Sequence, residues 1–226
     1  MTDTPLPLLS LLETRVLGVL VEKQHTVPDT YPLTLNALAA GCNQKTSRDP
    51  VLDATDAEVQ AAVDQLRSLS LVVESSGGRV MRYAHNVGRV LHLPSQGVAL
   101  LATMMLRGPQ TIGELRINCE RLHAFADLSA AQGFLDELAE RPAGSLAVLL
   151  PRRPGEREAR WMHLLAGTPD VSAGPSRDLR AHEAADVGVA EIAALKANLA
   201  QVSAELAAVK ATVARLCAEL GVRPDD

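Results

Sequence analysis

The chain has 226 residues, of which 47% are hydrophobic and 22% charged, and its formal net charge is −5. This composition is typical of a globular protein, and the length allows two small domains. One Trp, two Tyr and two Phe are too few for a stacking platform that binds single-stranded nucleic acid. No apolar run is long enough to span a bilayer and the first residues lack the basic start of a signal peptide, so we expect a cytoplasmic protein.

Three helices are predicted in the first part of the chain. An apolar stripe predicts a helix over residues 10–24. A short second helix is expected to begin at Thr34, whose hydroxyl suits an N-cap. A third helix is expected to begin at Thr55, because Thr55 and Glu58 have the spacing of a capping box.

A β-hairpin is predicted after these helices. The β-favouring runs 71–74 and 80–83 flank a connection that contains two glycines, which is a hairpin signal. Widely spaced residues then recur downstream, which indicates two copies of one structural unit. The recurring residues are Thr34, Leu38 and Cys42 with Thr111, Leu115 and Cys119, and Arg82, Tyr83 and His85 with Arg160, Trp161 and His163.

The second copy repeats the order of elements with shorter connections. Helices are expected over 95–106 and from Thr111 to about residue 122. A third is expected to open at Ser129, with Gln132 in the capping-box position, although this start is two residues out of register with the first copy. Two strands complete the copy, at 146–150 and 160–165.

Three helices followed by a hairpin is the plan of a winged helix-turn-helix domain. The expected fold is therefore mainly α with small β-hairpins, containing two tandem winged-helix domains at residues 1–90 and 91–168. Pro, Gly and Ser between residues 169 and 186 predict a linker. Residues 187–221 then predict a C-terminal coiled-coil helix.

The C-terminal helix carries apolar residues in alternating steps of three and four, which is a heptad seam. In a parallel pair Glu191 and Glu205 would face Lys196 and Lys210 of the other chain, which favours a homodimer. The alternative is a helix that folds back onto its own domains. The candidate dimerisation residues are Ile192, Leu195, Leu199, Val202, Leu206, Val209, Val213, Leu216 and Leu220.

Three segments carry a family resemblance. Residues 11–23, 31–36 and 42–51 resemble the YceH-like family of uncharacterised bacterial proteins, and the resemblance extends from about residue 10 to residue 165. It implies a tandem winged-helix fold with a coiled tail. It implies no activity, because the family has none established, and it transfers no catalytic or binding residue.

Duplex DNA binding is one functional hypothesis, because winged helices commonly place the third helix in the major groove. Both predicted third helices are acidic, which disfavours that mode. A polar loop and an arginine-rich second hairpin remain as contacts with bases and phosphates. The candidate DNA contacts are Asn43, Gln44, Lys45, Thr46, Arg48, Arg152, Arg153, Arg157 and Arg160.

A protein-interaction or regulatory module is the preferred hypothesis, and an enzyme is the least favoured. The chain has no phosphate-binding glycine loop, nucleophile elbow or His-Glu-x-x-His run, so we expect no catalytic residue and no cofactor. Cys119 and His123 have a spacing that two metal ligands on one helix face would have. Because Cys42 occupies the matching place in the first copy, both cysteines are expected to fill the core, and no metal is predicted.

Overall fold

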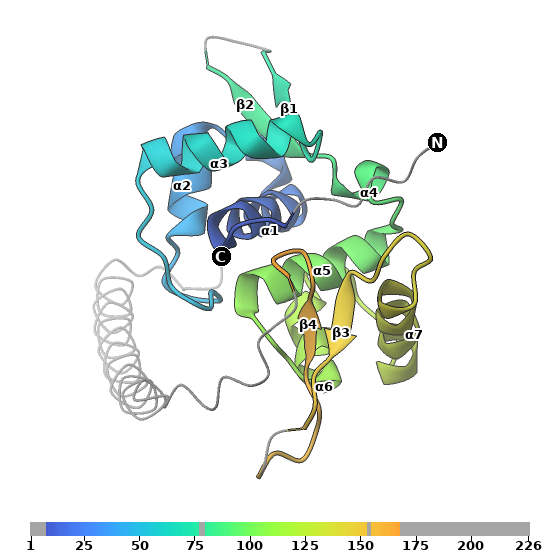
Figure 1. Cartoon of the computed structure of the whole chain (residues 1–226). Coiled ribbons are helices and arrows are strands. Elements are labelled where there is room, and N and C mark those ends of the chain that lie inside the picture. The colour runs from blue at the N-terminus through green and yellow to red at the C-terminus, as the bar shows by residue number, and fades with distance from the viewer. Residues whose placement is uncertain (1–7, 77–79, 153–154, 168–226) are drawn as a thin grey trace, which may run out of the picture. The chain divides into compact units, whose positions relative to one another are not determined.

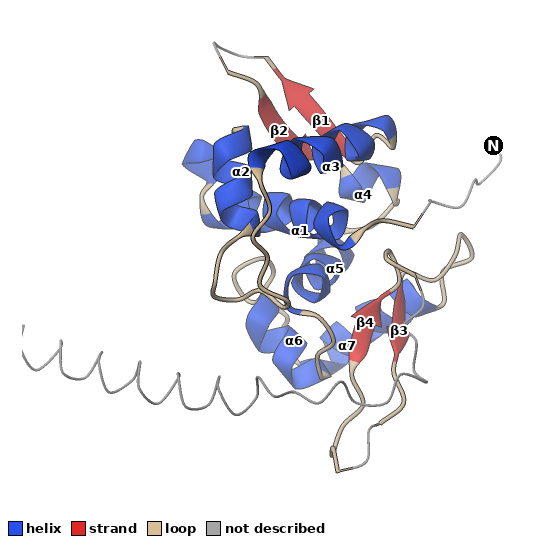
Figure 2. Ribbon diagram, turned by 60° about the vertical axis from the view of Figure 1, so that its left-hand side comes forward, coloured by secondary structure: helices blue, strands red, loops and turns tan. Residues whose placement is uncertain are grey.

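The computed structural model describes residues 8–76, 80–152 and 155–167, which belong to one compact unit (Figure 1). The predicted linker at 169–186 and the predicted coiled-coil helix at 187–221 lie outside the described residues. Within the described part of the chain, helices and two small antiparallel hairpins alternate as expected (Figure 2).

The first half contains the three predicted helices and the hairpin. Ser10 and Thr55 each form a capping box, and the Thr34 hydroxyl accepts a hydrogen bond from the backbone N–H of Ala37. These caps satisfy backbone donors at the helix starts, which explains why the predicted starts are correct. The elements are α1 (Leu11–Thr26), η1 (Pro28–Thr30), α2 (Leu35–Cys42), α3 (Asp56–Ser68), β1 (Val72–Ser75) and β2 (Arg82–His85).

The second half repeats this order after the short helix α4 (Val87–Val90). Its second helix ends at Cys119, earlier than predicted. There i→i−3 hydrogen bonds interrupt the α-helical pattern, from the Glu120 N–H to the Ile117 carbonyl at 3.3 Å and from the Leu122 N–H to the Cys119 carbonyl at 2.8 Å. The elements of this half are α5 (Ser95–Arg107), α6 (Ile112–Cys119), α7 (Leu128–Ala139), β3 (Ala147–Leu149) and β4 (Trp161–His163).

The predicted capping box at the start of α7 is wrong. The helix begins at Leu128, and the carboxylate of Asp127 accepts a 2.7 Å hydrogen bond from the N–H of Ala130. Aspartate is among the strongest N-cap residues, and it precedes Ser129 by two positions. The correction restores the repeat, because Asp127 precedes Leu138 by the same spacing that separates Thr55 from Leu66.

A pair of backbone bridges explains the recurring strand motif. Leu33, just before α2, pairs with the buried Tyr83 through hydrogen bonds of 2.8 and 3.0 Å. Gln110, just before α6, pairs with the buried Trp161 through bonds of 2.7 and 3.0 Å. In each half the second strand therefore ties the hairpin to the segment that opens the second helix.

The two halves share one hydrophobic core, in which α1 and α5 make the largest contact between elements. All residues of α5 from Gly97 to Leu106 are buried, which is the pattern of a helix enclosed on every side. Gly18 of α1 permits the close approach, because a Cβ atom there would lie 2.9 Å from Leu106 Cγ. Figure 1 shows α5 lying directly beneath α1.

Candidate interaction surfaces

The loop between α2 and α3 is anchored at both of its ends. The Asn43 side chain donates to the Ala54 carbonyl at 2.7 Å and accepts from the Ala54 N–H at 2.8 Å. The buried Arg15 guanidinium donates to the carbonyl oxygens of Cys42, at 3.1 Å, and Pro50, at 2.6 Å. Asn43 therefore holds the loop closed, and its side-chain amide is already occupied.

The same loop also contacts the second half. The N–H of Asp49 donates to the Leu106 carbonyl at 2.8 Å, and Arg107 donates to the Ser47 hydroxyl at 2.7 Å. Because the second copy has a shorter connection between its second and third helices, this contact belongs to the first copy alone. The asymmetry between the copies thus has a structural role: the loop joins the halves.

Arg48 is buried in an ion pair with Glu22, so its guanidinium does not lie on the surface that the sequence predicts to contact DNA. Its side chain is 0% exposed and contacts both carboxylate oxygens of Glu22, at 2.6 and 3.1 Å, and the Gly41 carbonyl at 3.1 Å. Burial raises the pKa of the Glu22 carboxyl, but the hydrogen bond and charge of Arg48, with Lys23, outweigh it and leave that pKa below its ordinary value.

The remaining loop candidates differ in their freedom. Gln44 donates to the Thr46 carbonyl at 3.1 Å, and its oxygen accepts from Arg48 at 3.3 Å and from Lys23 at 3.4 Å. Lys45 and Thr46 are exposed. Among the candidate DNA contacts of this loop, Lys45 is therefore the cation that faces solvent.

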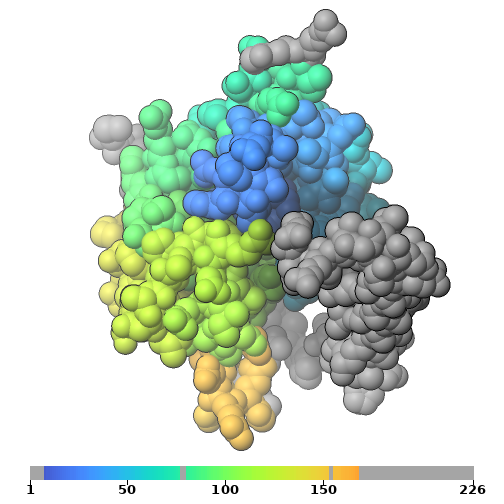
Figure 3. Space-filling view, turned by 180° about the vertical axis from the view of Figure 1, so that it is seen from behind, coloured from blue at the N-terminus to red at the C-terminus, as the bar shows by residue number. Residues whose placement is uncertain are grey.

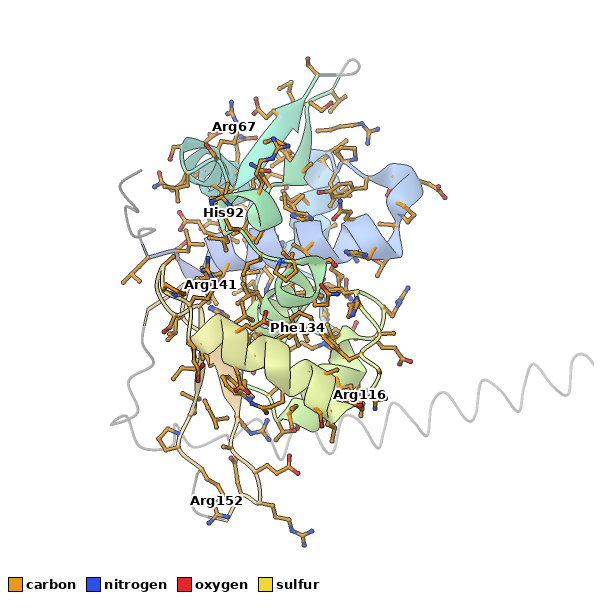
Figure 4. All side chains as sticks on the ribbon, turned by 90° about the vertical axis from the view of Figure 1, so that its right-hand side faces the viewer. Arg67, His92, Arg116, Phe134, Arg141 and Arg152 are labelled. Atoms are coloured by element: carbon orange, nitrogen blue, oxygen red, sulfur yellow. The ribbon has the colours of Figure 1, made fainter. Side chains whose placement is uncertain are left out.

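The second hairpin presents two exposed arginines near its tip, Arg152 and Arg157. Arg152 projects from the far end of the hairpin (Figure 4). Arg160 lies nearer the base, where it forms ion pairs with Glu114 at 2.7 Å and Glu156 at 3.5 Å. Arg153 lies outside the described residues.

The outer faces of α3 and α7 are acidic, as the sequence predicts. Arg67 of α3 is paired with Asp64 at 3.2 Å and with Glu74 at 2.8 Å. Arg141, which follows α7, donates to the Leu91 carbonyl. The exposed carboxylates are Asp56, Glu58 and Asp64 on α3, and Asp136, Glu137 and Glu140 on or beside α7.

Cys42 and Cys119 are both 0% exposed, so the prediction that they fill the core is confirmed. Burial raises the pKa of the Cys42 thiol to about 12 and that of Cys119 to about 11, which leaves both neutral and unreactive. The His123 ring packs edge-on against Phe125, with ring centroids 4.7 Å apart. Residues 8–76, 80–152 and 155–167 contain no group of three or more His, Cys, Asp or Glu side chains that would hold a metal.

Three residues of these surfaces are not among the candidates predicted from the sequence. Arg15 and Glu22 lie on α1, and Arg107 ends α5, yet all three meet the 43–54 loop. The signal for Arg15 is its place beside the apolar run 16–21, on the helix face that becomes buried. Glu22 and Arg107 have no such signal, because their partners lie far away in the chain.

The candidate dimerisation residues lie outside the described part of the structure. None of the described helices is both long enough and apolar enough to cross a membrane.

Comparisons with known proteins give matches over most of the chain. The family model described as "Protein of unknown function, DUF480" matches residues 9–156. A "UPF0502 protein" of Leptothrix cholodnii is 58% identical over 220 residues, covering 96% of this chain and 97% of the relative. Proteins with the same description are 56% identical over 198 residues in Dechloromonas aromatica, covering 88% and 91%, and 59% identical over 199 residues in Burkholderia multivorans, covering 86% and 83%.

Proposed function

The chain belongs to the DUF480 family of uncharacterised bacterial proteins, and from this premise we propose that it is a regulatory or protein-interaction module without catalytic activity. The family resemblance predicted from the sequence is confirmed. The proposal takes the two halves as tandem winged-helix units. The order of helices and hairpin in each half supports that fold, as do the matching bridges from Leu33 to Tyr83 and from Gln110 to Trp161.

The acidic outer faces of α3 and α7 carry the proposal. In a winged helix that reads DNA, the third helix meets phosphates, and lysine and arginine supply most of the affinity. Here the equivalent helices expose carboxylates, and the two arginines beside them are engaged in ion pairs or backbone hydrogen bonds. Such faces repel DNA and favour a protein partner with a basic surface.

Affinity purification of the tagged full chain from its native host tests this proposal. We expect a stoichiometric protein partner that is retained by the wild type and lost when Glu137 and Glu140 are both changed to Lys. Glu120→Lys changes an exposed carboxylate at the end of α6 and serves as the charge control, so it should retain the partner. Recovery of the same partner by all three chains would refute the acidic-face proposal.

Duplex DNA binding remains the second candidate, because three cations expected to contact DNA are exposed: Lys45, Arg152 and Arg157. Fluorescence anisotropy with a random duplex at about 50 mM salt separates the two functions. A DNA-binding protein would bind with an affinity that falls steeply as salt is added, and the triple variant K45E/R152E/R157E would abolish binding. We expect no measurable binding by either chain.

A further inference from the structure

A polar cavity lies at the boundary between the two halves and is not part of the acidic faces described above. It has a volume of about 130 Å³, whereas one bound water needs only about 10–15 Å³. In Figure 3 the blue first half and the green second half meet along this boundary. Its walls come from α1, the 43–54 loop, α5 and the end of α6, and its polar residues include Lys23, Gln44, Ser47, Arg107, Asn118 and Arg121.

Positive charge is concentrated around this cavity. Lys23, Arg107 and Arg121 line it, and Glu22 is the one carboxylate among the described lining residues. Glu22 is already bound by Arg48 through both oxygens and lies 3.2 Å from Lys23. Its single negative charge therefore cannot neutralise the surrounding cations, although the chain as a whole is acidic, with a formal net charge of −5.

Among the residues that the structure describes, no group accepts from the remaining N–H donors of these two arginines. Arg107 donates one N–H to Ser47 at 2.7 Å, which orients its guanidinium at the cavity wall. Arg121 is exposed, and no carboxylate in the described part of the chain lies within ion-pair distance of it. A guanidinium presents several N–H donors in a fork that matches phosphate oxygens, and lysine adds a point charge.

We propose that this cavity binds a small phosphate-bearing anion, either inorganic phosphate or a phosphomonoester. Lys23, Arg107 and Arg121 would hold the phosphate oxygens, while Leu106 and Leu122 would contact a small apolar portion of an organic ligand. Bound there, the anion touches α1, the loop, α5 and α6 at once and stabilises the contact between the halves. The inference goes beyond the proposed function and does not depend on the identity of the protein partner.

Isothermal titration of the full chain with inorganic phosphate, and separately with glycerol 3-phosphate, tests the site and distinguishes the two ligand sources. Both titrations are carried out in chloride buffer, with sulfate as a second tetrahedral anion. We expect saturable binding by the wild type. The lower dissociation constant then shows whether inorganic phosphate or a phosphomonoester is the preferred ligand. Arg121→Gln is expected to weaken it about tenfold or more, because a hydrogen bond to a charged group is lost.

Arg89→Gln is the matched control, because it removes an exposed arginine of α4 that does not line the cavity and should leave binding unchanged. Lys23→Gln provides a second pocket variant, and circular dichroism melting checks that each chain is folded. ³¹P line broadening of inorganic phosphate gives an independent readout. The proposal is overturned if the wild type shows no saturable binding, if Arg121→Gln and Arg89→Gln weaken binding equally, or if Arg121 is needed for duplex DNA binding but not for either small ligand.

Discussion

Two arginines are buried close together in the first half, and their partners differ in kind. Arg15 is bound by backbone carbonyl oxygens, and burial, followed by the nearby charge of Arg48, lowers its pKa from the ordinary value. Arg48 is instead neutralised by Glu22. A buried charge requires a partner, so the loss of one partner costs more than the net stabilisation by the pair. The Glu22–Arg48 pair therefore fixes the loop between α2 and α3 against α1 and the end of α2.

Replacing Arg48 by Met is expected to lower the free energy of unfolding by about 3–5 kcal/mol, because it leaves the Glu22 carboxylate without its main partner. Urea denaturation of the full chain measures the change. Arg67→Met, which breaks an exposed ion pair with Asp64 on α3 and a half-exposed one with Glu74 on β1, is expected to cost less than about 1 kcal/mol. The double variant Glu22→Gln/Arg48→Met should recover part of the stability lost in Arg48→Met. Equal costs for Arg48→Met and Arg67→Met would contradict the role of burial.

His163 predicts a pH dependence of stability. Burial lowers the pKa of its imidazole to about 4 from the ordinary 6.5. Below pH 6.5 the unfolded chain takes up a proton that the folded chain refuses, so stability is expected to fall from pH 6.5 to 4, by up to roughly 3 kcal/mol for this residue. Urea denaturation at several pH values should show a shallower decline for His163→Leu than for the wild type. An unchanged slope would contradict the assignment.

The sequence predicts individual residues well where their surroundings are local or repeated. The paired positions of Cys42 and Cys119 indicated a shared core location, and the structure confirms it. The burial of Arg48 could not be predicted, because it depends on Glu22, which lies 26 residues earlier in the chain. Likewise Arg107 and Ser47 are separated by 60 residues, so the cavity beside them has no signature in any one segment.

At the scale of elements, helix starts are set by side chains only a few residues away, which is why most of them were predicted. The starts at Thr34, Thr55 and Thr111 follow from hydroxyl caps. The start of α7 was predicted wrongly because two plausible caps, Asp127 and Ser129, lie close together. The Asp127 carboxylate forms the cap, so the helix begins earlier than predicted.

The corrected start of α7 can be tested with a matched pair of substitutions. Asp127→Ala removes the acceptor of the Ala130 N–H and is expected to lower the free energy of unfolding by about 1 kcal/mol. Ser129→Ala, at an exposed position inside the helix, is expected to change it by less than about 0.5 kcal/mol. Chemical denaturation measures both, and a larger loss for Ser129→Ala would restore the originally predicted start.

Across the whole described molecule, the contact between α1 and α5 makes the two halves one unit. Gly18 lies in that contact, where an added Cβ would lie 2.9 Å from Leu106 Cγ. A Cβ added at Gly133 in α7 would have open space around it. Gly18→Ala is therefore expected to destabilise the protein, by about 1–3 kcal/mol, through overpacking. Gly133→Ala should stabilise it, by about 0.5–1 kcal/mol, because glycine is costly within a helix. Thermal unfolding followed by circular dichroism compares the two variants, and a shift of the same sign for both would contradict the shared core.

The C-terminal heptad seam concerns the assembly of the whole chain, and its pairing stays a prediction. In a parallel dimer Leu206 would lie in the apolar seam, and Ala207 would lie outside it. A glutamate carboxylate placed in the seam would be shielded from water, which is costly for an unpaired charge. Multi-angle light scattering should therefore give a dimer mass for the wild type and for Ala207→Glu, and a monomer mass for Leu206→Glu. A wild type that is monomeric at all concentrations would instead favour the alternative in which this helix folds back onto its own chain. In that case Leu206→Glu should lower the melting temperature without changing the mass, so the two arrangements are separated by the same pair of variants.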